Sequence, residues 1–292
     1  MLKKCFGIIS WLPDEEQARK ERKARLDRLI KQLNELWPDI DILIVAQNWG
    51  RLKVPKVSNK IIVKRYNPLG ILGARKALRE EFLNLDYDYI ITFDDDAIIE
   101  CSAETAADDY MKAIDAHPNG FCFIHSGIKN YTFDDYKAAQ LNLCAISRYV
   151  FEKAPYVDVD PQKNEAFEDH TYAYYLHVKF AACEFMPPET ITHVQFLNKN
   201  EPVPSTWNRQ PGLRTNHLVS NTHAILRYIK EHGELPTDIH KFIEDYQRSI
   251  PEVKVNPTLA PPKTSDDRIF VKSKPRIGIQ VSGAHKTNYL YF

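Results

Sequence analysis

Three consecutive aspartates, Asp94, Asp95 and Asp96, follow directly on an apolar run at residues 89–93. Such a run is typical of a buried strand, and open α/β sheets bind their ligands beyond the carboxyl ends of their strands. The carboxylates of Asp94 and Asp96 can share a hard cation, which in turn can neutralise a bound diphosphate. The triplet therefore predicts a site for Mn²⁺ or Mg²⁺ and a diphosphate, although acidic loop residues without any ligand are common.

Candidate partners for the triplet lie at two places downstream. Glu168 and Asp169 precede an aromatic-rich run at residues 170–178 with helical character. The dipole of a helix favours an ionised carboxylate in its first turn, where it can accept a proton, although the pair could also serve only to stabilise the helix. His193 is a candidate third metal ligand, because neutral imidazole binds Mn²⁺. A histidine with a purely structural place in a core or on a surface is the alternative.

The segments that must position these residues alternate between strand and helix. Apolar, β-prone runs predict strands at residues 5–10, 41–46, 60–64, 89–93 and 121–125. Apolar residues at helical spacing predict helices between them, first Leu26, Leu29, Ile30, Leu33 and Trp37, then Ala74, Ala77, Leu78, Phe82 and Leu85. This alternation predicts an open, mostly parallel α/β sheet flanked by helices. We interpret the basic run from Arg19 to Lys31 as a solvated helix face rather than an anion-binding site.

The C-terminal part of the chain has a different pattern. Helices are predicted from Asn216 to Gly233 and over residues 237–249, where apolar residues recur at helical spacing. After Pro251 the chain is rich in Pro and Lys, and residues 251–292 are expected to form an irregular tail. The chain of 292 residues is long enough for one large domain with such an appendage.

Composition excludes several classes of protein. Because the 39 basic and 39 acidic residues balance, no overall charge directs the chain to a polyanion. Its five cysteines contain no C-x-x-C pair, which favours buried free thiols in a reducing compartment over a zinc site. No run approaches the ~20 apolar residues of a membrane span, and no signal-like apolar region follows the N-terminus. We therefore expect a cytoplasmic protein with no transmembrane segment.

Three motifs in order resemble a known family. Residues 73–99, GARKALREEFLNLDYDYIITFDDDAII, resemble the GT-A glycosyltransferase pattern, in which an Arg-bearing helix leads into a strand capped by D-x-D. The lead-in DYDY is similar to that of the β-1,4-galactosyltransferase-like group. Glu168 and Asp169 resemble the Glu-Asp catalytic pair of that group, and His193, followed by KNEP at residues 199–202, resembles its metal histidine. The likeness covers roughly residues 5–205.

This resemblance implies a GT-A (Rossmann-like) fold and a metal-dependent glycosyltransferase, a hexosyltransferase that moves a sugar from a nucleotide-sugar donor, in particular a UDP-sugar. It implies a catalytic domain at residues 1–205, with a nucleotide-sugar half at about 1–100 and an acceptor half at about 101–205, before a helical extension at 206–250. The implied roles are metal and diphosphate binding for Asp94 and Asp96, donor binding for Asp95, a contact with the donor nucleotide for Arg75, proton acceptance for Asp169 beside Glu168, and metal binding for His193.

If Asp169 is the base, the reaction is a single displacement that inverts the anomeric centre. Ser10, Trp11 and the loop at residues 47–49 follow the first two predicted strands and are candidates for nucleotide contacts, with Asn48 the best of them. Ordinary turn residues are an equally good interpretation of these positions.

Two other functions are compatible with parts of the pattern. A haloacid-dehalogenase-type phosphatase also places D-x-D after an apolar strand, but its pattern requires Thr or Val where Ile98 stands, and a downstream acidic motif that this sequence lacks. A non-catalytic carbohydrate- or protein-binding module is the third possibility. It predicts neither metal binding nor turnover of a donor.

The sequence does not determine the acceptor, which could be a glycan, a lipid-linked molecule, a protein or, less readily, a nucleic acid. Basic residues near the C-terminus could bind an anionic acceptor, although a solubilising tail explains them better. These residues are Arg209, Arg214, Arg227, Lys230, Lys263, Arg268, Lys272, Lys274, Arg276 and Lys286.

Overall fold

The computed structural model describes residues 2–95, 97–98, 111–112, 114–116, 118–124, 132–133, 136–137, 144–156, 168–180, 182–185, 192–193, 216–249, 278–283 and 286–291. The chain begins with β1 (Lys4–Trp11), α1 (Glu16–Leu36), β2 (Asp41–Gln47), β3 (Ile61–Tyr66), α2 (Gly70–Leu83) and β4 (Tyr89–Asp94). The strands and helices predicted for this part are all present, and β4 ends at the first aspartate of the triplet.

Beyond β4 the described residues form further strands and helices. The strands are β5 (Ala97–Ile98), β6 (Phe121–Ile124), β7 (Thr132–Phe133), β8 (Tyr136–Lys137), β9 (Cys144–Ser147), β10 (Ala182–Phe185), β11 (Thr192–His193), β12 (Gly278–Gly283) and β13 (Lys286–Tyr291). The helices are α4 (Arg148–Lys153), α5 (Glu168–Lys179), α7 (Asn216–His232) and α8 (Ile239–Ser249). Helices α7 and α8 lie where the sequence predicted them. No helix among the described residues is long and apolar enough to cross a membrane.

The main sheet has the strand order β13-β12-β10-β6-β9-β4-β1-β2-β3. Strands β1 to β4 are mutually parallel, β10 is parallel to β6, and β9 runs antiparallel between β4 and β6. The predicted mostly parallel α/β sheet is therefore confirmed. Strands β2 and β3 lie on one side of β1, whereas β4 lies on the other, so the strand order reverses between β1 and β4. Ligand crevices of open α/β sheets form at such a reversal.

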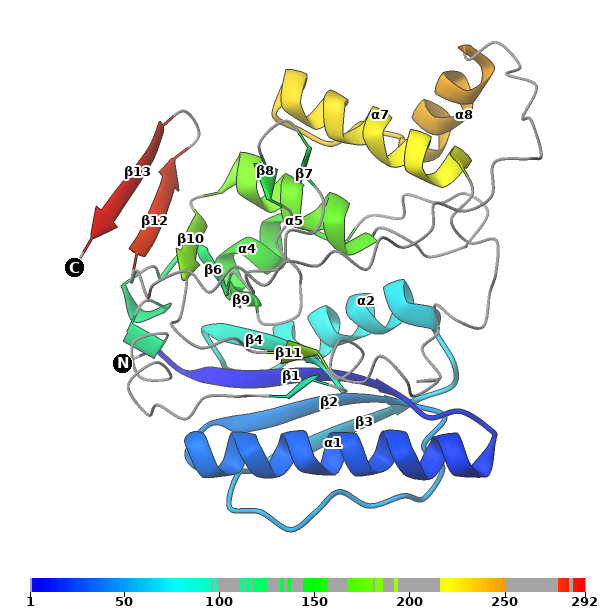
Figure 1. Ribbon diagram of the computed structural model, residues 1–292, viewed down its shortest axis with the longest axis vertical. Helices are drawn as coiled ribbons and strands as arrows, with labels where there is room; N and C mark the ends of the chain where they lie inside the picture. The colour runs from blue at the N-terminus through cyan, green and yellow to red at the C-terminus, as the bar shows by residue number, and fades with distance from the viewer. Residues whose placement is uncertain are drawn as a thin grey trace, which may run out of the picture.

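Helices cover both faces of the sheet (Figure 1). Alternate residues of β1 point to opposite faces, as a pleated strand requires. Phe6 and Ile8 pack with the apolar stripe of α1 on one face, whereas Cys5 and Ile9 belong to the core that α2, α5, α7 and α8 build on the other. Because both faces are buried, the central strands read as continuous apolar runs, which is the pattern seen in the sequence.

The C-terminal segment departs from the predicted irregular tail. Residues 278–283 and 286–291 form the antiparallel strands β12 and β13, and β12 pairs with β10 from Ala182↔Ser282 to Phe185↔Ile279. The prediction of an irregular conformation over these residues was wrong, because Ile279 and Val281 alternate with small or polar residues and so favour a strand. The Pro-rich composition before them concealed this signal. Residues 250–277 lie outside the described part of the chain.

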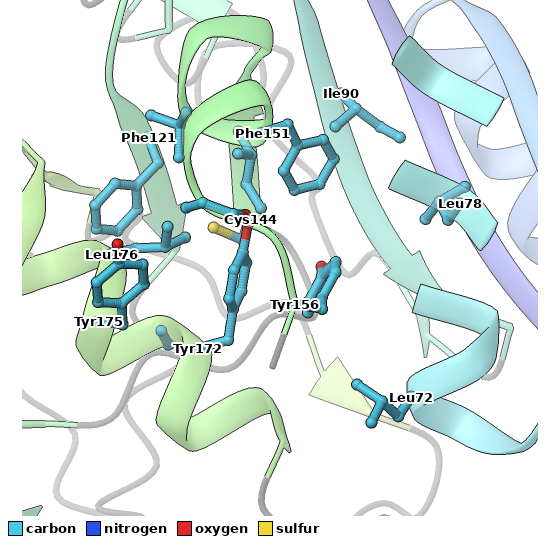
Figure 2. Packing of buried hydrophobic residues seen from close by; sticks show 14 of the residues in the cluster. Leu72, Leu78, Ile90, Phe121, Cys144, Phe151, Tyr156, Tyr172, Tyr175 and Leu176 are labelled. Carbon is cyan, nitrogen blue, oxygen red and sulfur yellow. Dashed lines mark hydrogen bonds between the residues drawn. The ribbon is translucent and has the colours of Figure 1, made fainter. Parts of the chain in front are cut away.

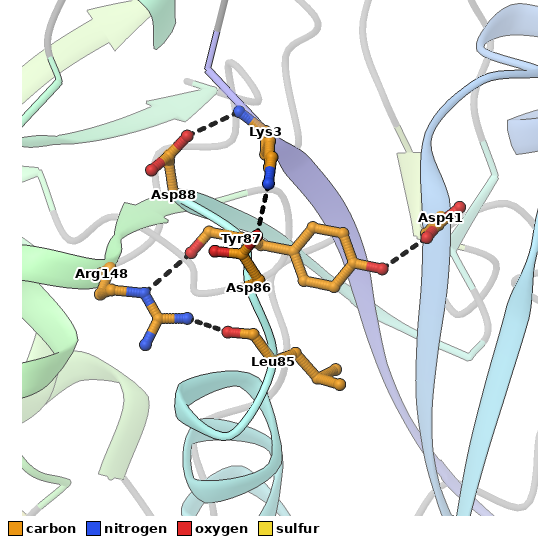
Figure 3. A network of polar contacts seen from close by, with 7 residues as sticks. All are labelled: Lys3, Asp41, Leu85, Asp86, Tyr87, Asp88 and Arg148. Atoms are coloured by element: carbon orange, nitrogen blue, oxygen red, sulfur yellow. Dashed lines mark hydrogen bonds and ion pairs between the residues drawn. The ribbon is translucent and has the colours of Figure 1, made fainter.

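A polar network lies at the edge of the sheet where the parallel strands begin (Figure 3). We call this the amino edge. The main-chain nitrogen of Lys3 donates to the carboxylate of Asp88 at 2.7 Å, and its ammonium pairs with Asp86. The guanidinium of Arg148 donates to four main-chain carbonyl groups at and after the end of α2, those of Phe82, Leu83, Leu85 and Tyr87. Arg148 thereby satisfies carbonyl groups that a helix end leaves without partners.

Candidate active site

The carboxyl ends of β1, β2 and β4 bring several predicted site residues to one edge of the sheet. Ser10 and Trp11 end β1, Asn48 follows β2, and Asp94 ends β4 in register with Ile9. We call this the carboxyl edge. Because β1 and β4 flank the reversal in strand order, the first aspartate of the triplet lies at the place where this fold class binds ligands.

Asp94 is accessible from this edge. Its side chain retains 21% exposure, and the guanidinium of Arg75 lies 3.7 Å from its carboxylate. Arg75 comes from α2 and is only 4% exposed, so the sheet and the helix enclose its charge. A ligand that reached Asp94 would therefore meet a carboxylate backed by a fixed positive charge.

Asp95 is turned into the protein. Its side chain is 2% exposed, its Oδ2 accepts a hydrogen bond from the Ser10 hydroxyl at 2.7 Å, and its Oδ1 lies 2.7 Å from a guanidinium nitrogen of Arg22. Ser10 is itself buried and accepts a hydrogen bond from the indole of Trp49 at 3.2 Å. Asp95 and Ser10 were predicted to contact the donor, but here their polar atoms bind one another. A donor contact by either residue remains a prediction.

Trp11 and Asn48 complete the loops at this edge. The guanidinium of Arg22 lies 5.7 Å from the ring centroid of Trp11. Asn48 has a φ of 57°, in the left-handed region that Asn tolerates better than most residues. Its side-chain amide donates to the carbonyl of Leu12 and to the carboxylate of Asp14, both at 2.8 Å. Asn48 thus ties the loop after β2 to the loop after β1, and its predicted nucleotide contact is untested.

Strand β11 brings His193 to the triplet from a distant part of the sequence. His193 pairs with Ala97, and Thr192 with Ile98, in an antiparallel ladder with β5. Ala97 is the first residue after the triplet, so the main chain of His193 lies one residue beyond the last aspartate. Asp96 lies outside the described residues, and for His193 the structure describes the main chain alone. Among the side chains that are described, no three His, Cys, Asp or Glu residues are grouped so that they could hold a metal.

Helix α5 begins at Glu168, in agreement with the prediction that the acidic pair opens a helix. Tyr172, one turn into α5, lies beside Cys144 of β9 (Figure 2). Cys144 pairs with Thr92 of β4, and its main-chain carbonyl oxygen accepts a hydrogen bond from the Thr92 hydroxyl at 3.1 Å. Because Thr92 is two residues before Asp94, the first turns of α5 lie towards the carboxyl edge.

The other end of α5 lies at the amino edge. Phe180, just after the helix, packs edge-to-face on Tyr149, with ring centroids 6.2 Å apart. Tyr149 belongs to α4, which starts where β9 meets the first residue of β4. Helix α5 therefore runs from the carboxyl edge to the amino edge. Its acidic start, Glu168 and Asp169, lies at the same edge as Asp94.

Two cysteines, Cys5 and Cys144, have described side chains, and neither takes part in this chemistry. Cys5 and Cys144 are free and buried, as the composition predicted. Burial raises the pKa of both thiols well above its usual range, so neither supplies a thiolate at neutral pH. Carboxylates and cationic side chains are therefore the reactive groups described at the carboxyl edge.

Arg22 is the site residue that the sequence analysis missed. It belongs to the basic run of α1, which was interpreted as solvated, yet its side chain is only 15% exposed and faces Asp95. Its position offered one signal. Arg22 stands four residues before Leu26, so it continues the buried face of the helix towards its N-terminus.

No protein-family model matches the chain, and no curated protein is similar to it in sequence. Several solved structures resemble its fold, and three of them are described here. A protein assigned as a nucleotide-diphospho-sugar transferase from Desulfovibrio desulfuricans G20 is 10% identical, with a TM-score of 0.42 over 84% of this chain and 99% of its own. A protein of STIV is 15% identical, with a TM-score of 0.34 over 59% of this chain and 76% of its own. A glycosyltransferase involved in glycosylation of the major capsid of PBCV-1 is 9% identical, with a TM-score of 0.31 over 51% and 62%. At TM-scores below 0.5 these likenesses do not decide the function, which has to be argued from the site.

Proposed function

We propose that the protein is a glycosyltransferase that uses a divalent cation and a nucleotide-sugar donor, in particular a UDP-sugar, and transfers the hexose to an acceptor hydroxyl. The supporting observation is that three predicted motifs, far apart in the sequence, converge on the carboxyl edge. They are the end of β4 at Asp94, the main chain of His193 beside Ala97, and the acidic start of α5. Packing alone does not require acidic segments to gather where the strand order reverses.

The residues at this edge fit Mn²⁺ or Mg²⁺. Asp94 offers a hard carboxylate oxygen at a position with 21% exposure, Asp96 would supply a second carboxylate, and His193 an imidazole nitrogen. A bound cation would neutralise the charge that develops on the departing diphosphate. Arg75, 3.7 Å from Asp94, would add a fixed positive charge beside the same phosphate groups.

On the acceptor side, we assign Asp169 as the general base. Its carboxylate takes the proton of the acceptor hydroxyl while the hydroxyl oxygen forms a bond to the anomeric carbon. The bond from that carbon to the diphosphate oxygen breaks, and its electron pair leaves with the nucleoside diphosphate. This single displacement inverts the anomeric configuration. The first turn of α5 suits the role, because the helix dipole favours a carboxylate there.

Calorimetric titration with UDP tests the donor half of the proposal. UDP should bind in the presence of Mn²⁺ and lose most of its affinity in EDTA. Asp94→Asn should weaken binding without unfolding the protein, whereas Asp86→Asn, a 93% exposed acid at the amino edge, is the matched control and should bind normally. Equal affinity for UDP with Mn²⁺ and with EDTA, or no binding in either, would reject the proposed site.

A further inference from the structure

The middle aspartate of the triplet joins four elements of the fold. Asp95 follows β4, Ser10 is the last residue but one of β1, Arg22 lies on α1, and Trp49 follows β2. We infer that Arg22 and Asp95 form a positioning pair that fixes the triplet, and that Asp95 is an internal anchor rather than a ligand of the cation or the donor. The inference rests on the proposed function for what the triplet binds.

Both oxygens of the Asp95 carboxylate are engaged inside the protein. Oδ1 lies 2.7 Å from the Arg22 guanidinium, and Oδ2 accepts the Ser10 hydroxyl at 2.7 Å. With 2% of the Asp95 side chain exposed, an incoming cation could reach these oxygens only after both contacts were broken. Asp94 differs, because its side chain remains 21% exposed.

Two tryptophans support the pair. The indole of Trp49, 1% exposed, donates to the Ser10 hydroxyl at 3.2 Å and so orients it towards Asp95. The ring of Trp11 lies beside the Arg22 guanidinium, with 5.7 Å between guanidinium carbon and ring centroid. Because little water reaches the contact, solvent and salt screen this ion pair less than a surface pair.

A fixed Asp95 constrains its neighbour. Asp95 meets Arg22 of α1, whereas Asp94, the last residue of β4, meets Arg75 of α2, so the two neighbouring carboxylates are directed to opposite faces of the sheet. Arg75 then meets Asp94 from the α2 side. Arg22 thus acts on the proposed site through Asp95, from a helix that lies on the other face of the sheet from α2.

The test compares Asp95→Asn, Arg22→Gln and the double variant, with Arg22→Lys as the conservative replacement. Lys20→Gln, on the same helix with 68% of the side chain exposed, is the control. Mn²⁺ affinity is measured by electron paramagnetic resonance. Donor KM and kcat are measured from the release of UDP from a UDP-sugar. Each single change should weaken Mn²⁺ binding and raise donor KM about tenfold with little change in kcat at saturation, as for other residues that orient ligands. The double variant should lose no more Mn²⁺ affinity than the more impaired of the two single variants. Arg22→Lys should bind Mn²⁺ more tightly than Arg22→Gln does.

Two results would overturn the inference. If Asp95→Asn lost Mn²⁺ binding while Arg22→Gln matched the wild type, Asp95 would be a ligand. If the losses multiplied in the double variant, the two residues would act separately.

A third measurement separates this inference from the proposed function. If the wild type bound neither Mn²⁺ nor a donor, the proposed function would fail. Hydrogen exchange at the main-chain amides of residues 94–98 would still test whether Arg22 and Asp95 form a positioning pair. Faster exchange there in Arg22→Gln and Arg22→Lys, with protection unchanged in β2 and β3, supports the pair. Exchange rates equal to those of the wild type in both Arg22 variants would contradict the positioning pair. Because this measurement needs only the Arg22 variants, it can be made even if Asp95→Asn does not fold.

Discussion

The two edges of the main sheet use arginine in different ways. At the amino edge, Arg148 donates to main-chain carbonyl groups around the end of α2, and the acids nearby bind Lys3 (Figure 3). At the carboxyl edge, Arg22 and Arg75 both face aspartates of the triplet, and their side chains are 15% and 4% exposed. The arginine at the amino edge thus supplies hydrogen bonds to a helix end. At the carboxyl edge, in contrast, oppositely charged side chains lie together around the loop that follows β4.

This difference supports our proposal that the ligand site lies at the carboxyl edge. Buried ion pairs contribute little net stability, because the desolvation of both charges offsets their attraction. A cluster of partly buried arginines and aspartates is therefore a poor way to stabilise a sheet. It is a good way to hold carboxylates in fixed directions at a ligand site. The predictions below set the carboxyl edge, where changes should alter catalysis, against the amino edge, where they should alter stability.

The largest effect is expected at the acidic start of α5. Asp169→Asn should lower kcat by roughly 10²–10⁴-fold, because Asn keeps the size of Asp but cannot accept the proton of the acceptor hydroxyl. Donor KM and Mn²⁺ affinity should stay near the wild-type values in steady-state assays. Glu168→Gln is the adjacent control and should remain active. An inactive Glu168→Gln beside an active Asp169→Asn would assign the base to Glu168.

A smaller effect is expected from the metal site. Asp94→Asn should weaken Mn²⁺ binding by roughly 10–100-fold, because the amide lacks the charge of a hard carboxylate ligand. Asp96→Ala should act in the same direction. Titration with Mn²⁺ in an activity assay measures both, and a melting temperature close to that of the wild type shows that the fold is intact. If Asp96→Ala unfolded the protein instead, the triplet would be structural.

At the amino edge the effect should fall on stability. Arg148→Met should lower the free energy of unfolding by about 2 kcal/mol, because it removes a charged donor from carbonyl groups around the end of α2. Urea denaturation measures the loss. At a temperature where the variant is folded, its donor KM and kcat should equal those of the wild type. A selective loss of activity would break the proposed division between the two edges.

The smallest effect concerns Tyr87, which also lies at the amino edge and donates its hydroxyl to Asp41 (Figure 3). Burial, together with this hydrogen bond, raises the pKa of Tyr87 above its usual value of 10.0. As the pH rises above 10.0, the unfolded chain releases this proton before the folded protein does, so the stabilising contribution present at lower pH is lost. Unfolding curves of Tyr87→Phe should show a shallower decline with pH in this range. An identical decline in both proteins would contradict the assignment.

Much of the sheet was predictable because its signals are local. Continuous apolar runs mark β1, β2 and β4, and apolar residues at helical spacing mark α1 and α2, since burial on both faces imposes those patterns directly. Strand β9 was not predicted. It runs antiparallel between β4 and β6 and consists of four residues, so its pairing depends on distant strands rather than on its own composition.

The site was predictable in its residue types and less so in their orientation. The sequence pointed to Asp94 and to the start of α5, because acids that follow an apolar strand or open a helix carry a local signature. It did not reveal that Asp95 faces inward or that Arg22 meets it, since that contact joins residues 73 positions apart on two elements. The inward direction of Asp95 is set by the tertiary packing of α1 and Trp49 around it.

Donor turnover tests the central claim most directly. The pure protein is incubated with UDP-sugars and other nucleotide sugars in Mn²⁺, in Mg²⁺ and in EDTA, and release of the nucleoside diphosphate is measured, with Asp94→Asn and Arg148→Met run in parallel. We predict release from at least one UDP-sugar that requires the cation, that falls sharply in Asp94→Asn, and that persists in folded Arg148→Met. Undiminished release in EDTA, or no release from any nucleotide sugar by folded wild-type protein that also fails to bind UDP, would contradict a cation-dependent glycosyltransferase site at the carboxyl edge.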